Sequence, residues 1–131
     1  MIKSPTVLIV EDEEVLMRAL ADGFKAKGYQ VLGAYDGEKG LEISLKSLPD
    51  MILLDLTMPV MDGVTMLKKM REYPNGRQLK VIVLTNLNVP AKASETAGLG
   101  IIDYIVKSDW KLKDIIDRVS TELSLQDANL K

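Results

Sequence analysis

Polar side chains that could do chemistry follow four short apolar runs of the chain. Glu11 and Asp12 follow the first of these runs, and Asp55, Thr85 and Lys107 each follow one of the other three. If these runs are parallel strands, their carboxyl ends meet at one rim of a sheet, where the ligand crevice of an open α/β domain lies. We therefore expect the five side chains to converge on one pocket, although they are far apart in the sequence.

The residue types at this rim suggest a metal ion and a phosphoryl group. Three neighbouring carboxylates repel one another unless one is protonated or a cation lies among them. The chain has no cysteine and no histidine, so a metal would have oxygen ligands, which favours Mg²⁺ or Ca²⁺. A metal alone needs neither Thr85 nor Lys107, but phosphoryl oxygens accept from a hydroxyl and pair with an ammonium group. Asp55, alone after the run 51–54, is the best candidate for a nucleophile that forms an acyl phosphate.

The elements that position these residues alternate along the chain. The expected strands cover residues 6–10, 30–34, 51–54, 80–84 and 101–106. The expected helices cover residues 13–27, 38–48, 64–73, a weaker segment at 91–97, and a last helix from about residue 109. Unbroken apolar strands are typical of a parallel sheet that is covered on both faces. Short connections between strands and helices then predict an open, doubly wound α/β domain.

Composition and charge limit the function classes. With 131 residues, 47% of them apolar and 27% charged, the chain has the size and composition of one globular domain. We expect the domain at residues 1–125 and a frayed polar tail at 126–131. No segment matches a signal peptide or a membrane span, so we expect a soluble, cytoplasmic protein. The net charge of −2 argues against direct nucleic-acid binding.

Taken together, these residues resemble the receiver domains of two-component response regulators. The resemblance covers residues 7 to about 119. It rests on the acidic pair Glu11-Asp12, the segment 51–63 around Asp55, Thr85, and the segment 103–107 that ends in Lys107. It implies a flavodoxin-like, five-stranded parallel sheet in the order 2-1-3-4-5 with five helices.

The resemblance also implies roles for individual residues. Asp55 would be the phosphoacceptor and a Mg²⁺ ligand. Asp12 would bind Mg²⁺ directly and Glu11 would bind it through water, with the backbone carbonyl of Thr57 as a further ligand. Lys107 would pair with the phosphoryl group.

A conformational switch and two partners follow from the same resemblance. Thr85 would move toward the phosphoryl group, and Tyr104 would change rotamer in response. The phosphoryl donor would be a histidine kinase or a small molecule such as acetyl phosphate. The output partner or domain would bind the face made by the fourth helix, the fifth strand and the fifth helix. Turnover would be limited to self-phosphorylation and slow self-dephosphorylation, so the chain would not be an ordinary enzyme.

Two positions depart from the usual pattern of this family. Ser108 replaces a proline that usually forms a cis peptide after the lysine, so we expect a trans bond there. Ser108 could instead cap the last helix. Asn86 stands where a small residue usually follows the switch threonine. We predict that Asn86→Ala changes the dephosphorylation rate; unchanged decay of the labelled protein would remove this idea.

Other interpretations of the same residues remain open at this point. Residues 11–14 alone are typical of an acidic helix N-terminus with Asp12 as the N-cap. Thr85 alone would be a structural hydroxyl at a strand end, and Lys107 alone would be a solvated surface lysine. A Mg²⁺-dependent phosphatase or mutase typically has a second Asp where this chain has Thr57. A flavin-binding protein would need a phosphate-binding loop after the first strand. The acidic residues 11–14 stand at that position and would repel phosphate. A degenerate receiver that acts only as a docking module is the remaining alternative.

Overall fold

The computed structural model describes residues 4–86 and 94–129, and the side chains of residues 4–86 and 94–125. In these ranges it has five strands, four α-helices and two short 3₁₀ helices. In chain order they are β1 (Thr6–Val10), α1 (Glu14–Ala26), β2 (Gln30–Ala34), α2 (Gly37–Ser47), β3 (Met51–Asp55), α3 (Gly63–Glu72), η1 (Pro74–Gly76), β4 (Val81–Thr85), β5 (Ile101–Val106), η2 (Lys107–Asp109) and α5 (Leu112–Asn129).

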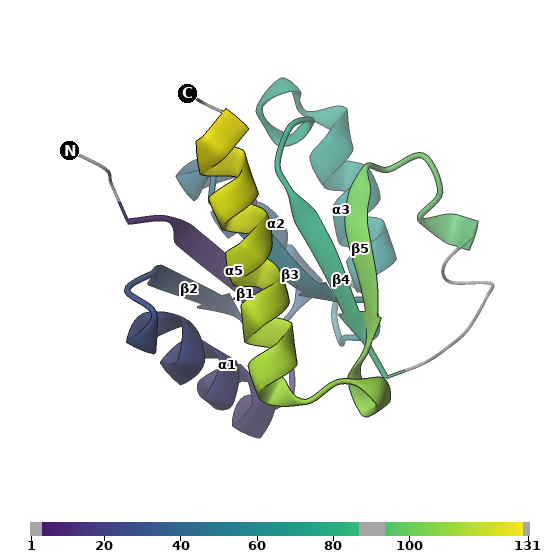
Figure 1. The fold of residues 1–131 in the computed structure, drawn as a ribbon. Helices are drawn as coiled ribbons and strands as arrows, with labels where there is room; N and C mark the ends of the chain where they lie inside the picture. Colours follow the sequence, from purple (N-terminus) through teal and green to yellow (C-terminus); the bar gives the residue numbers. More distant parts are fainter. Residues whose placement is uncertain (1–3, 87–93, 130–131) are drawn as a thin grey trace.

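The five strands form one parallel sheet in the order β2-β1-β3-β4-β5, which confirms the predicted topology (Figure 1). In β3 and β4 every residue is buried, as expected for strands that are covered on both faces. The register pairs Val10 with Leu54 and Asp55 with Leu84. The residues that follow these strands therefore lie at the same end of the sheet.

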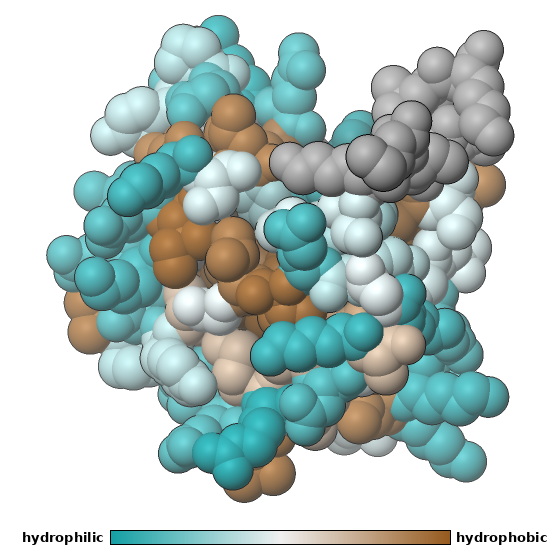
Figure 2. Space-filling model, turned by 90° about the vertical axis from the view of Figure 1, so that its left-hand side faces the viewer, coloured by the Kyte–Doolittle hydropathy of each residue, from teal (hydrophilic) through white to brown (hydrophobic). Residues whose placement is uncertain are grey.

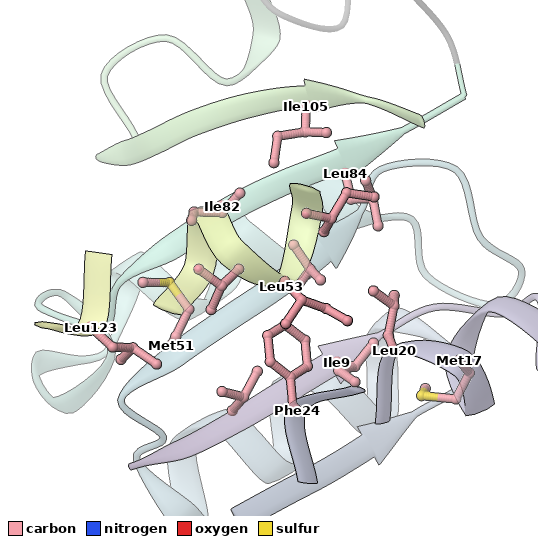
Figure 3. Close-up of a cluster of buried hydrophobic side chains, with 14 residues drawn as sticks. Ile9, Met17, Leu20, Phe24, Met51, Leu53, Ile82, Leu84, Ile105 and Leu123 are labelled. Atoms are coloured by element: carbon pink, nitrogen blue, oxygen red, sulfur yellow. The ribbon is translucent and has the colours of Figure 1, made fainter. Parts of the chain in front are cut away.

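Helices cover both faces of the sheet and bury two apolar clusters (Figure 1). α1 and α5 pack on one face, where Phe24 of α1 and Leu123 of α5 belong to the same buried cluster as the sheet residues Met51, Leu53 and Ile82 (Figure 3). α2 and α3 pack on the other face. In α5 the apolar residues at helical spacing from Ile115 to Leu123 are buried. Leu112, the first residue of α5, is 38% exposed.

β2 is an edge strand of this sheet. Figure 2 faces the side of the molecule on which β2 lies in Figure 1 and shows hydrophobic surface ringed by hydrophilic side chains. Val31 and Leu32 of β2 are only half-buried, which agrees with that view. None of the described helices is long and apolar enough to cross a bilayer.

The last helix differs from its predicted start. Residues Lys107–Asp109 form η2, and α5 begins at Leu112 rather than near residue 109. Ser108 therefore lies inside η2, and the suggestion that it caps the last helix is wrong. The described residues contain no cis peptide bond, which agrees with the trans bond expected at Ser108.

Two further predictions concern segments at the limits of the described chain. The expected fourth helix at 91–97 falls partly on residues 87–93, which lie outside the described residues; residues 94 and 95 are helical and a turn follows. α5 extends to Asn129. The predicted domain boundary and the frayed tail at 126–131 stay predictions.

Candidate functional site

Asp55 ends β3 at the carboxyl rim of the sheet and is only 4% exposed. Its Oδ1 accepts the backbone N–H of Thr57 at 3.1 Å, and its Oδ2 lies 3.4 Å from the ammonium of Lys107. A side chain at Gly63 would overlap the backbone carbonyl of Asp55, so glycine lets α3 begin directly beside this strand end. Burial raises the pKa of Asp55, and the Thr57 N–H and Lys107 offset part of that rise.

Glu11 directly follows β1 and is more deeply buried than Asp55, at 1% exposed. Its Oε1 forms an ion pair with Lys107, and its Oε2 accepts the backbone N–H of Glu13 at 2.9 Å. Burial raises the pKa of Glu11 to about 6, although Lys107 and the Glu13 N–H act in the opposite direction. Asp55 adds to the rise because like charges repel.

Lys107 lies between these two carboxylates. It begins η2, immediately after β5, and its side chain is 9% exposed. Its ammonium is 2.5 Å from Glu11 Oε1 and 3.4 Å from Asp55 Oδ2. Burial lowers the pKa of Lys107, but the two carboxylates outweigh burial and the net shift is upward. The lysine therefore stays charged at neutral pH and can hold an anion at this position.

Asp12 completes the predicted acidic cluster. Glu11, Asp12 and Asp55 each offer one carboxylate oxygen, and these oxygens lie within 4.8 Å of one another. Asp12 is exposed, whereas the other two are buried, so the cluster opens to solvent on the Asp12 side. The alternative role of Asp12 as N-cap is wrong, because Glu13 precedes α1 and no side chain caps it.

The donor set fits a hard divalent cation. Three carboxylates around one ammonium leave a net charge of −2 when all are ionised. Two of these carboxyl groups have raised pKa values, which shows that burying their charges is unfavourable without further compensation. Carboxylate oxygens are the ligands that Mg²⁺ and Ca²⁺ prefer. Glu11, Asp12 and Asp55 are therefore the residues that could hold such an ion.

The structure also places the two predicted switch residues. Thr85 ends β4, is 1% exposed, and is in register with Val106, the residue before Lys107. Tyr104 lies on β5 and packs against the cluster on the α2–α3 face. Its hydroxyl is buried and has no hydrogen-bond partner among the described residues, and burial raises its pKa.

Two arginines with structural roles were missed by the sequence analysis. Arg71 donates hydrogen bonds to backbone carbonyls on both sides of β4, including Leu79 and Leu99 at 2.8 Å. Arg118 pairs with Asp103 at 2.8 Å and with Glu122 at 3.1 Å. Arg71 bonds to backbone carbonyls and Asp103 is 15 residues from Arg118, so no local pattern predicts these contacts; only the i,i+4 spacing of Arg118 and Glu122 is visible in the sequence.

Comparison with known proteins identifies the family. The family model described as "Response regulator receiver domain" matches residues 7–120. The chain therefore belongs to the receiver domains of two-component response regulators, and its acidic cluster fits the phosphorylation site of that family.

Individual relatives agree with this assignment. Sporulation initiation phosphotransferase F of Bacillus subtilis is 32% identical over 120 residues, which cover 92% of this chain and 94% of that protein. Response regulator PleD of Caulobacter vibrioides is 35% identical over 104 residues, 79% of this chain, but the chain spans only 23% of PleD. The solved receiver domain of the Francisella response regulator 1452 is 27% identical, with a TM-score of 0.81 over 94% of this chain and 99% of that one.

Proposed function

We propose that this chain is a Mg²⁺-dependent phosphoacceptor switch in which Asp55 receives a phosphoryl group from a histidine kinase. One observation carries the proposal: the oxygens of Glu11, Asp12 and Asp55 lie within 4.8 Å of one another, and Lys107 reaches two of these carboxylates. Such a cluster suits a metal ion and a phosphoryl group together. The phosphotransferase name of the Bacillus subtilis relative agrees with phosphoryl transfer.

In the proposed transfer, a carboxylate oxygen of Asp55 attacks the phosphorus of a phosphohistidine. The P–N bond breaks, its electron pair returns to the imidazole, and a new P–O bond makes an acyl phosphate. Lys107, already 3.4 Å from Asp55 Oδ2, pairs with the transferred phosphoryl oxygens. The Thr57 N–H holds the other carboxylate oxygen and so fixes the orientation of the nucleophile.

A metal ion would be held by Asp12, Asp55 and Glu11, with the Thr57 carbonyl as the further ligand that the family resemblance implies. When bound, Mg²⁺ neutralises the negative charge that the phosphoryl oxygens bring into the pocket. Asp12 is the exposed member of the set, so an ion would enter from its side.

Exposed apolar side chains around the rim support docking of a protein donor there. Val15 lies in the first turn of α1 and Val60 lies between β3 and α3, and they are 77% and 76% exposed. Tyr35 follows β2 at 53% exposed, and Trp110 lies between β5 and α5 at 36%. All four lie in segments that follow the carboxyl ends of strands, at the rim where Asp55 lies, so a donor protein that docks there would be able to contact them.

The proposed response to phosphorylation uses Thr85 and Tyr104. Thr85 is next to the strand end that carries Lys107, and the Tyr104 hydroxyl has no hydrogen bond among the described residues that would hold it in place. An acyl phosphate at Asp55 would attract the Thr85 hydroxyl, and Tyr104 would then repack. We propose that the output partner or domain binds on the side of β5 and α5 and responds there to the repacking of Tyr104.

Incubation with acetyl phosphate and Mg²⁺, followed by intact mass measurement, tests the proposal. We expect one phosphoryl adduct that depends on Mg²⁺ and is absent from Asp55→Asn. Asp50→Asn is the matched control, because Asp50 is an exposed loop aspartate that should leave the adduct unchanged. No adduct in the wild type under any metal condition would favour a receiver that only docks, and multiple turnover of small phosphate esters would favour an enzyme.

A further inference from the structure

The end of the sheet opposite to Asp55 contains a second polar pocket, of about 530 Å³. It lies where β4 and β5 begin, between the η1–β4 connection and the turn before β5 (Figure 1). Its volume is in the usual range for small-molecule sites. None of the residues that define the phosphoacceptor pocket lines it.

Three cationic side chains line this pocket, and no acid does. They are Arg71, Arg77 and Lys80. Arg77 and Lys80 are exposed and follow one another closely in the chain, so both can turn toward a ligand. The potential inside the pocket is therefore positive, which favours an anion.

Arg71 makes the charge of this pocket unusual, because it is half-buried without a carboxylate partner among the described residues. Its Nε and Nη1 donate to the carbonyls of Leu99, Gly76 and Leu79, each at 2.8 Å. These bonds satisfy most of its N–H groups but leave its formal charge uncompensated. Arg71 is only half-buried and its carbonyl partners have no formal charge, so it adds a fixed positive charge to the wall of the pocket.

Part of the pocket wall is backbone, and Gly100 in this part lies beside the Arg71 guanidinium. Gly98 and Gly100 have φ angles of +80° and +75°, a conformation that favours glycine. A side chain at Gly98 would meet nothing within 4 Å, so the pocket is open on that side. Leu79, Leu99 and Ile102 add apolar surface between the charged residues.

We propose that this pocket binds a small organic phosphate, with Arg77 and Lys80 on the phosphate and the apolar wall against its organic part. Guanidinium groups bind phosphate through paired hydrogen bonds, and lysine contributes a point charge. The proposal does not depend on phosphorylation of Asp55, because no residue is shared between the two pockets.

Titration of the ¹⁵N-labelled chain with AMP tests the proposal, in metal-free buffer of low ionic strength so that the acidic cluster recruits no Mg²⁺–nucleotide. We expect the largest amide shifts at Lys80, Gly98 and Gly100. The affinity, measured by calorimetry, should fall at least tenfold in the double variant Arg77→Ala/Lys80→Ala. Both side chains are exposed, and unchanged urea unfolding of the variant would show that its fold is intact.

The matched control is Lys111→Ala/Lys113→Ala, which removes the same charge from exposed positions at the start of α5 and should keep wild-type affinity. Titrations with ribose 5-phosphate and with inorganic phosphate show whether the pocket recognises an organic phosphate or free phosphate. Tighter binding of AMP than of inorganic phosphate supports an organic ligand. Equal binding of adenosine and AMP, equal loss in both double variants, or shifts centred on Asp55 and Lys107 would each overturn the proposal.

Discussion

Two groups of charges in this molecule have the same composition and different surroundings. In each, one cation lies between two carboxylates: Lys107 between Glu11 and Asp55, and Arg118 between Asp103 and Glu122. The first group is almost fully buried, with side chains 9%, 1% and 5% exposed. The second joins β5 to α5 and keeps 25%, 34% and 20% of its side chains exposed.

The difference in burial distinguishes the Lys107 group, the proposed phosphoacceptor site, from the Arg118 group, a structural contact. In the buried group, the pKa values of both carboxyl groups are raised by burial in spite of the adjacent lysine. Exposed Asp12 adds a third carboxylate to the same cluster. Water screens the Arg118 group and its geometry is good, so it contributes modest stability and leaves little unbalanced charge. The buried and incompletely balanced charge of the first group is what the proposed metal and phosphoryl site requires.

The largest effect is expected from removing the cation of the buried group. Lys107→Met should lower the free energy of unfolding by about 3 kcal/mol at pH 7 without metal, because two buried carboxylates lose their partner. Urea unfolding measures the change, and the exposed control Lys111→Met should stay within about 0.5 kcal/mol of wild type. If Lys107→Met is as stable as the control, the two groups do not differ in the way described.

The pH dependence of stability should reveal the raised pKa of Glu11. In the folded state Glu11 keeps its proton up to about pH 6, whereas in the unfolded chain it releases the proton near pH 4.5. This contribution to stability is therefore complete below about pH 4.5 and is lost as the pH rises through 6. It amounts to about 2 kcal/mol. Metal-free unfolding of wild type and Glu11→Gln from pH 4.5 to 7 should show this loss only in wild type; parallel curves would contradict it.

A smaller effect is expected in the half-exposed group. Arg118→Met should lower the free energy of unfolding by about 1 kcal/mol, because each partly exposed ion pair contributes only a fraction of that. The difference should shrink at high salt, and acceptance of a phosphoryl group by Asp55 should be unchanged. A loss as large as that of Lys107→Met would show that burial does not separate the two groups.

The smallest effect concerns backbone strain beside the buried group. Val60 lies between β3 and α3 with φ +68°, and Met61 N–H donates to the Pro59 carbonyl across it at 2.7 Å. This tight turn is unfavourable for a β-branched residue. Val60→Gly should therefore raise the free energy of unfolding by about 0.5 kcal/mol, after allowing for the entropy of glycine. Leu48→Gly, at the φ +47° cap of α2, is the matched variant and should gain less; a loss in Val60→Gly would rule out the strain.

Sequence patterns predicted the strands almost to the residue, because apolar runs bounded by polar or turn residues leave little freedom in a parallel sheet. β1, β2 and β5 have their predicted bounds, β3 ends one residue later, and β4 both begins and ends one residue later. The start of α5 was predicted less well. Lys107–Asp109 form a 3₁₀ turn there, whose first residue pairs with Glu11 and Asp55, and α5 begins only at Leu112.

The types and order of the candidate site residues were determined by the sequence alone: acids after β1 and at the end of β3, a hydroxyl at the end of β4 and a lysine after β5, all at the carboxyl rim of the sheet. Only the tertiary structure decided that Glu11 and Asp55 share one buried lysine while Asp12 stays exposed. It also decided that Arg71 compensates its burial with backbone carbonyls. Residue type and the position of an apolar run are local properties that a pattern can encode, whereas the strand order was implied only by the family resemblance. Burial and pairing depend on the distance between segments far apart in the chain, and folding alone sets that distance.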